Sequence, residues 1–288
     1  MIKIRNPRIQ YIVELLTYNN ETKLGFLLVA AIVAAAIVVA LTGIGVLPYD
    51  PIEQDVGPPL AAPSLEHPFG TDILGRDVFS RILYATPNDI FVSFVVVGVS
   101  FLVGALLGAT AGYRGGLLDE ALMRYTDVIF AIPALVLAIS IAVILGPGMT
   151  HMMYALLIIW WPPYARLARG EALRVSHQNY IEAARASGIG SFRILTRHVL
   201  PNILTPMVAY ATIDIGSVVI IYAGLSYLGL SIRPPWPEWG AMVSAYQDYL
   251  VSAPWLPLFP AFVIGIVVVA FSILGDGLRD AVEAARIG

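Results

Sequence analysis

The chain has 288 residues, of which 58% are hydrophobic and only 13% are charged, and its mean hydropathy is +0.78. A soluble domain has roughly 45–50% apolar and about 25% charged residues, so this composition excludes a water-soluble protein. It also excludes a disordered chain, which requires low hydrophobicity and high net charge. The net charge of −3 argues against nucleic acid as a partner. The chain contains no cysteine, so disulfides and thiolate metal sites are excluded as well.

Uncharged segments long enough to cross a bilayer recur along the chain. A helix needs about 20 apolar residues to cross a hydrocarbon core roughly 30 Å thick. The uncharged stretch 128–165 is far too long for one helix and is interrupted by Gly146-Pro147-Gly148, so it predicts two spans joined by a tight turn. We therefore expect an all-α polytopic membrane protein with six transmembrane helices. The other four predicted spans are 24–47, 90–113, 203–228 and 257–274.

The distribution of Lys and Arg predicts the orientation of these spans. Six spans place both termini on the same side as the loops that follow spans two and four. That side carries all but three of the 17 Lys and Arg residues; the exceptions are Arg76, Arg81 and Arg233. Cytoplasmic loops are enriched in these residues, so we expect both termini in the cytoplasm and the chain in the inner membrane of a prokaryote.

The segments that flank the first span have patterns of their own. Residues 1–23 form the predicted cytoplasmic N-terminal segment, in which apolar residues at helical spacing over 8–18 indicate a short interfacial helix. The predicted external loop, 48–89, contains the acid-first pairs Asp72–Arg76 and Asp77–Arg81, which favour an amphipathic helix.

The remainder, 90–288, is predicted to be a five-helix core with a long cytoplasmic loop, 166–202. Within that loop, Asn179 and Glu182 have the spacing of a capping box, which predicts a helix that begins at Asn179. Gly188 is placed to end that helix in the left-handed conformation. A second helical piece, 192–199, leads to Leu200-Pro201, which we expect to end it at the membrane surface. The result is a short helix whose small-residue face another protein can approach closely.

This loop resembles the EAA loop of ABC importer membrane subunits, in the residues Glu182-Ala183-Ala184, Gly188 and Leu200-Pro201. In that family the loop is the coupling helix that docks into a cleft of the ATPase subunit. The other interpretation is an amphipathic helix that lies on lipid headgroups. The resemblance assigns ATPase coupling to Tyr180, Glu182, Ala183, Ala184, Ser187, Gly188, Leu200 and Pro201.

Further segments resemble the C-type subunits of dipeptide and oligopeptide importers. They include the external signature His67–Asp77, the run His198–Asn202 and the run Leu225–Leu230. The chain departs from the family at two places. Tyr222 stands where the family usually has an acidic residue. After the external helix, Ala85-Thr86-Pro87 and Asp89-Ile90 stand where the family usually has Gly-Ala-Arg and Ser-Leu. A tyrosine changes both charge and bulk, so a substrate preference that depends on that acid does not carry over.

The resemblance implies a type I ABC importer permease fold and a set of partners. These are a second, homologous permease, two ABC ATPase subunits and an extracytoplasmic substrate-binding protein. The solute would be a dipeptide, an oligopeptide, a nickel complex or an oligosaccharide. The chain has only two lysines, Lys3 and Lys23, and neither follows a glycine, so a phosphate-binding Walker A loop is excluded. We therefore expect no catalytic residue and no cofactor in this chain, with ATP and Mg²⁺ held by the ATPases.

Asp214 is an ionisable residue inside the fifth predicted span, and such residues are usually functional. Two interpretations stay open. Asp214 lines a translocation path together with Thr212, Ser217 and Tyr222, or its carboxyl group is satisfied by neighbouring hydroxyl groups. The alternative functions are a secondary transporter in which Asp214 couples to an ion gradient, and a structural membrane protein. The histidines show no ligand spacing, so no metal site is predicted; they are His67, His151, His177 and His198.

Overall fold

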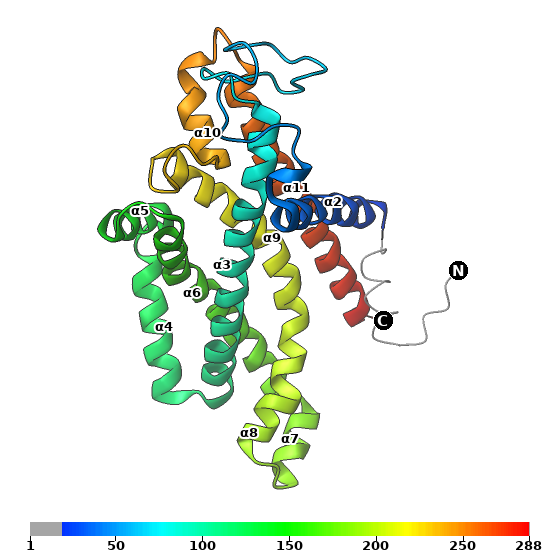
Figure 1. Ribbon diagram of the computed structural model, residues 1–288. Helices are drawn as coiled ribbons and strands as arrows, with labels where there is room; N and C mark the ends of the chain where they lie inside the picture. Colours follow the sequence, from blue (N-terminus) through cyan, green and yellow to red (C-terminus); the bar gives the residue numbers. More distant parts are fainter. Residues whose placement is uncertain (1–18, 288) are drawn as a thin grey trace.

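The computed structural model describes residues 19–287 (Figure 1). The predicted interfacial helix at 8–18 lies outside the described residues. Within the described part of the chain, the only β-structure is an isolated bridge between Thr71 and Asp77. The expected all-α class is confirmed.

Ten α-helices account for most of the described residues. Short 3-10 turns follow α2 at Gly43–Val46 and α10 at Gln247–Tyr249, and a π-helical turn at Leu195–Val199 joins α8 to α9. The helices are α2 (Asn20–Thr42), α3 (Val78–Arg114), α4 (Gly116–Phe130), α5 (Ala134–Leu145), α6 (Met149–Ser176), α7 (Asn179–Ala186), α8 (Ser191–Ile194), α9 (Leu200–Tyr227), α10 (Trp239–Tyr246) and α11 (Trp255–Ile287).

The molecule is elongated, and its two ends differ. In Figure 1, α7 and α8 form one end, while α10 and the loop before α3 form the other, with α3, α6 and α9 between them. The two loops that the sequence assigns to opposite sides of a membrane therefore lie at opposite ends.

The count of six spans is not confirmed. Among the described residues, four helical segments are long and apolar enough to cross a membrane, and α4 with α5 makes a fifth if the two count as one span. The missing span is α6, which has the length but contains Trp160-Trp161-Pro162-Pro163 and several charged residues. Those residues lower its hydropathy, and much of α6 is covered by neighbouring helices. The four segments are Asn20–Val46, Val78–Arg114, Ser191–Tyr227 and Trp255–Ala284.

The predicted third span differs most from expectation. The sequence predicts that it begins near residue 128 as one span, but α4 already begins at Gly116 and meets α5 at an angle of 86°. Pro133 precedes α5, and because proline has no N–H group it interrupts the helical hydrogen-bond ladder. The tight turn predicted between spans three and four is confirmed, with Gly146 at φ 84° and Gly148 at φ 151°.

The helix that the sequence predicts in the external loop is the first part of α3. It begins at Val78, capped by the Asp77 carboxylate, which accepts a hydrogen bond from the Ser80 N–H at 2.7 Å. It then continues through Pro87 to Arg114, so the boundary expected at residue 89 falls inside one helix. Asp77 acts as a cap rather than as the partner of Arg81, and Asp72–Arg76 lies in the turn before the helix.

Glycines bring α3 and α6 into close contact. Gly104, Gly108 and Gly112 share one face of α3, and a Cβ atom at Gly108 would lie 2.1 Å from the carbonyl oxygen of Ala165. Small residues at four-residue spacing allow membrane helices to pack backbone against backbone. This contact fixes the position of α6, which carries two of the side chains at the site described below.

Candidate coupling and transport sites

The segment between α6 and α9, residues 177–199, is called the α7 segment here. It is shorter than the predicted loop of 166–202, because α6 extends to Ser176 and α9 begins at Leu200. The N-cap of α7 is Gln178, which makes no side-chain capping bond, and Asn179 is already helical. The predicted capping box is therefore wrong.

The C-terminal end of α7 is as predicted. Gly188 has φ +78°, and its N–H donates to the Arg185 carbonyl oxygen at 2.9 Å. The Ile189 N–H donates to the Ala184 carbonyl oxygen at 3.1 Å. These two bonds form a Schellman motif, in which a glycine in the left-handed region ends the helix.

Leu200-Pro201 does not end the second helical piece. The helical path continues from Ser191 through the π-helical turn into α9, so that 191–227 forms one long segment. Pro201 lies in the first turn of α9, directly after the π-helical turn at Leu195–Val199, where the α-helical hydrogen-bond pattern already changes. The expected stop at the membrane surface is therefore wrong.

One face of α7 is anchored and the other is exposed. Ile181 is fully buried. The Arg185 guanidinium lies over the Tyr113 ring at 5.1 Å, which links α7 to the end of α3. The Tyr180 and His198 rings lie 6.3 Å apart. Of the eight residues assigned to coupling, only Ala184 and Leu200 are partly buried; the exposed ones are Tyr180, Glu182, Ala183, Ser187, Gly188 and Pro201.

Ion pairs that the sequence analysis missed join α4 to α6. Arg169 forms a two-pronged pair with Asp119, at 2.5 and 2.6 Å, and Arg166 contacts Asp127 at 2.7 Å. Such fork-shaped pairs fix geometry as well as supplying energy. The partners are far apart in sequence, so no local pattern could have identified them.

Asp214 is 8% exposed and is held by two side chains of α6. Its Oδ2 atom accepts hydrogen bonds from Trp160 Nε1 at 2.5 Å and from the Tyr164 hydroxyl at 2.8 Å. It also lines a cavity of about 290 Å³ at the break between α4 and α5. Features of both interpretations of Asp214 are therefore present: polar neighbours hold the carboxyl group, and the group faces a cavity.

The other residues assigned to the translocation path do not join Asp214. The Thr212 hydroxyl donates to the Val208 carbonyl oxygen within α9. Ser217 lies one turn farther along α9 and is exposed. Tyr222 is buried farther along α9, where its hydroxyl lies 3.1 Å from Ser231 Oγ.

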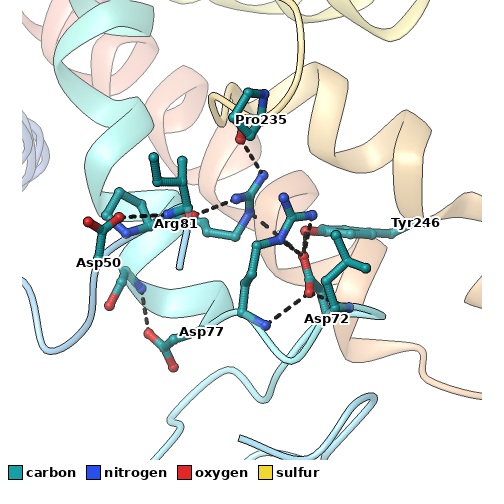
Figure 2. Close-up of polar contacts among 11 residues, drawn as sticks. Asp50, Asp72, Asp77, Arg81, Pro235 and Tyr246 are labelled. Atoms are coloured by element: carbon teal, nitrogen blue, oxygen red, sulfur yellow. Dashed lines mark hydrogen bonds and ion pairs between the residues drawn. The ribbon is translucent and has the colours of Figure 1, made fainter. Parts of the chain in front are cut away.

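The loop 50–77 and α10 form the opposite end of the molecule, called the cap here. Arg81 joins its parts, because it donates to the carbonyl oxygens of Pro51 at 2.5 Å and Pro235 at 3.3 Å (Figure 2). The fully buried Asp72 accepts hydrogen bonds from Arg76 at 2.7 Å and from the Tyr246 hydroxyl at 2.9 Å. Burial raises the pKa of Tyr246 to about 12, so this hydroxyl stays a donor.

A second polar group in the cap is Glu238, the N-cap of α10. Its carboxylate accepts hydrogen bonds from the backbone N–H groups of Gly240 at 3.0 Å and Ala241 at 2.8 Å. Asp89 of α3 accepts the next backbone donor, the Trp239 N–H, at 3.2 Å. Burial raises the pKa of Glu238, since both carboxyl groups lie in the protein interior.

Comparison with known proteins identifies the family to which this architecture belongs. The family described as "Binding-protein-dependent transport system inner membrane component" matches residues 104–287. The chain belongs to this family. The matched part of the permease includes α4 to α11, and with them the α7 segment and Asp214.

Relatives of the permease include three named transport subunits. It is 41% identical over 224 residues to the dipeptide transport system permease protein DppC of Alkalihalophilus pseudofirmus, which covers 78% of this chain and 74% of that protein. It is 39% identical over 235 residues to the probable D,D-dipeptide transport system permease protein DdpC of Escherichia coli K12, covering 82% and 79%. It is 43% identical over 221 residues to the glutathione transport system permease protein GsiD of Pectobacterium atrosepticum, covering 77% and 73%. The expected resemblance to the dipeptide and oligopeptide group is confirmed.

Among solved structures, the permease resembles a chain of the MetNI methionine ABC transporter in an inward-facing conformation. The TM-score is 0.56 at 21% identity, over 70% of this chain and 97% of that chain. At this identity the likeness shows a shared fold, and it confirms the expected ABC importer permease fold.

Proposed function

We propose that this permease imports a dipeptide- or glutathione-type solute and that ATP hydrolysis in separate subunits drives the import through α7. The observation that carries the proposal is the exposed face of α7 at the end of the molecule opposite the cap. An exposed helix with alanines on part of its surface, anchored by one buried isoleucine, suits a partner that approaches the backbone closely. The substrate class is supported by the names of the relatives.

The proposed coupling is mechanical. α7 follows α6 directly and is joined to α9 through α8, and Arg185 contacts Tyr113 at the end of α3. A displacement of α7 by closing ATPase subunits would therefore move α6 and α9, the two helices that meet at Asp214. Alternating access follows if this movement opens the helix bundle at one end and closes it at the other. ATP and Mg²⁺ bind in the partner subunits, and this chain supplies no catalytic group.

The proposed assembly contains a second, homologous permease, two ATPase subunits and an extracytoplasmic binding protein. The ATPases dock at α7 on the cytoplasmic side, and the binding protein delivers solute at the cap. Both termini of the chain lie in the cytoplasm, as the distribution of Lys and Arg indicates.

The test is isolation of the tagged chain from native membranes in mild detergent, followed by identification of the proteins that accompany it. We expect a P-loop ATPase and a second permease. Ala183→Trp, on the exposed face of α7, should reduce recovery of the ATPase while the second permease stays bound. Val251→Trp is the matched control, because Val251 is 97% exposed and lies between α10 and α11, near the cap. A wild-type chain that is recovered alone and still transports solute without ATP would overturn the proposal and favour the ion-gradient alternative.

A further inference from the structure

Only one of the two oxygen atoms of the Asp214 carboxylate accepts hydrogen bonds. Both of its hydrogen bonds, from Trp160 and Tyr164, go to the Oδ2 atom. Among the described residues, no group donates to Oδ1 and no Lys, Arg or His forms an ion pair with Asp214. A buried carboxylate without a charge partner is destabilising, and a positively charged ligand would offset that cost.

The cavity in front of Asp214 has aromatic walls. Phe130, Trp160 and Tyr210 line it together with Ile132 and Pro133 from the break between α4 and α5. The Tyr210 ring packs edge-on against Tyr164 at 5.3 Å, so both aromatic residues are held in place. Aromatic faces attract organic cations, and they do so most strongly where water is excluded.

Nearby cationic side chains are already paired elsewhere. The Arg166 guanidinium lies 4.3 Å from the centre of the Phe130 ring, on the cavity wall. Its ion-pair partner, however, is Asp127 at 2.7 Å. Arg169, one turn farther along α6, pairs with Asp119. Among the described residues, Asp214 therefore has no ion-pair partner, and a cationic ligand would supply one.

We propose that the Asp214 cavity is a binding subsite for the primary ammonium group of the transported peptide. The ammonium would donate to Asp214 Oδ1 and lie against Trp160 and Tyr210. The role of this site in transport rests on the function proposed above, whereas its ability to bind an ammonium group does not.

The donor set favours an organic ammonium over a metal ion. A calcium ion takes 6–8 oxygen ligands and magnesium six, whereas this cavity offers one carboxylate and otherwise mostly apolar and aromatic groups. A single negative charge matches a monovalent cation. The volume of about 290 Å³ accommodates an amino terminus with its first side chain.

The experiment compares two peptides that differ only in the positive charge. The full chain is placed in lipid nanodiscs, and binding of radiolabelled alanyl-alaninamide and of N-acetyl-alanyl-alaninamide is measured by equilibrium dialysis. Tryptophan fluorescence locates the bound peptide, since Trp160 donates to Asp214; the signal is compared with that of Trp160→Phe. We expect saturable binding of the free amine, binding of the acetylated peptide at least tenfold weaker, and a fluorescence change that Trp160→Phe removes.

Variants test the role of the charge. Asp214→Asn should weaken binding of the free amine at least tenfold, whereas Asp214→Glu should keep much of it and shows that the site tolerates substitution. Asp248→Asn, at an exposed carboxylate beside the cap, is the matched control and should bind like the wild type.

Several results would overturn the assignment. These are equal binding of the two peptides by the wild type, no saturable binding of the free amine, or the same loss in Asp248→Asn as in Asp214→Asn. Displacement of the free amine by sodium ions at equal concentration would instead identify an inorganic cation site. If no ATPase is recovered with the chain, only the coupling proposal is overturned. If the ATPase is recovered but the chain does not bind the free amine, only the proposed ammonium subsite is overturned.

Discussion

The two ends of the permease are built in opposite ways. The cap is held by buried polar groups that join segments far apart in the sequence, among them Arg81, Asp72 and Glu238. Helix α7 itself has one buried residue, Ile181, and one ring contact to α3, and the chain links it to α6 and to α8. A network of buried hydrogen bonds resists displacement, whereas an exposed helix with few tertiary contacts can move as a unit. The difference predicts that changes in the cap affect stability and that changes at α7 affect coupling.

The largest effect is expected from Asp72→Ala in the cap. The substitution removes the acceptor for Arg76 and Tyr246 and leaves a buried guanidinium and hydroxyl without a partner. We expect a loss of about 3–5 kcal/mol in the free energy of unfolding. Thermal unfolding of the purified chain in detergent should show a fall in Tm on the order of 10 °C.

Glu53→Ala is the control for Asp72→Ala. Glu53 lies in the same loop but is exposed, and among the described contacts its side chain makes no hydrogen bond. Its Tm should stay within about 1 °C of the wild type, because exposed substitutions change stability little. A cap that tolerates Asp72→Ala as well as Glu53→Ala would show that this network does not hold the external end together.

The next effect concerns Gly188→Val at the end of α7. A Cβ atom would find open space there, so the cost comes from the backbone, which has φ +78°. The left-handed conformation costs an L-residue roughly 1–2 kcal/mol, and more for a β-branched side chain. We expect the end of α7 to shift, so that transport falls about tenfold while ATP hydrolysis by the assembled importer continues. Uptake and ATPase activity measured in the same vesicles give this ratio.

Gly190→Val is the control that distinguishes the effect of the left-handed backbone at Gly188 from the effect of replacing any glycine of this segment. Gly190 also has open space around it, but its φ of −63° suits any residue. Its vesicles should transport and hydrolyse ATP at the wild-type ratio, and the abundance of both variants in the membrane should be normal. Wild-type transport in Gly188→Val would contradict the coupling role of α7.

Short sequence patterns correctly predicted those features of the structure that depend on neighbouring residues in the chain. The apolar runs identify most of the helices that could cross a membrane, and Gly188 marks the end of α7. Predictions from the sequence fail where a contact with a distant segment of the chain determines the structure. Pro133 accompanies a bend, whereas α3 passes through Pro87 without a break, so a proline alone does not decide where a helix ends. The donors to Asp214 come from α6, and no spacing within α9 indicates them.

The α7 capping box shows the same limit on a smaller scale. Asn179 and Glu182 have the right spacing, yet the helix begins at Asn179 itself, because the chain leaves α6 only two residues earlier. The four-residue spacing of Gly104, Gly108 and Gly112 indicates a face for close helix packing, but it does not indicate that α6 is the helix that packs there.

The smallest effect is expected from Glu238→Gln, and it tests whether the cap responds to pH. Burial raises the pKa of Glu238 above its ordinary value of 4.5, so the folded state holds the proton more tightly than the unfolded state. The stability that this group contributes is fully present below the unfolded pKa and is lost as the pH rises through the folded pKa. Glutamine is neutral at every pH and keeps an oxygen that can accept from Gly240 or Ala241.

Unfolding of the wild type and of Glu238→Gln is therefore compared from about pH 4 to about pH 8. The two should be equally stable at the acidic end, and the variant should become the more stable of the two as the pH rises. A difference in stability between wild type and Glu238→Gln that stays constant with pH would show that the pKa of Glu238 is the same in the folded and unfolded states, and it would contradict the prediction. A wild type that gains stability over the variant as the pH rises would show instead that the folded state favours the ionised carboxylate as the N-cap of α10.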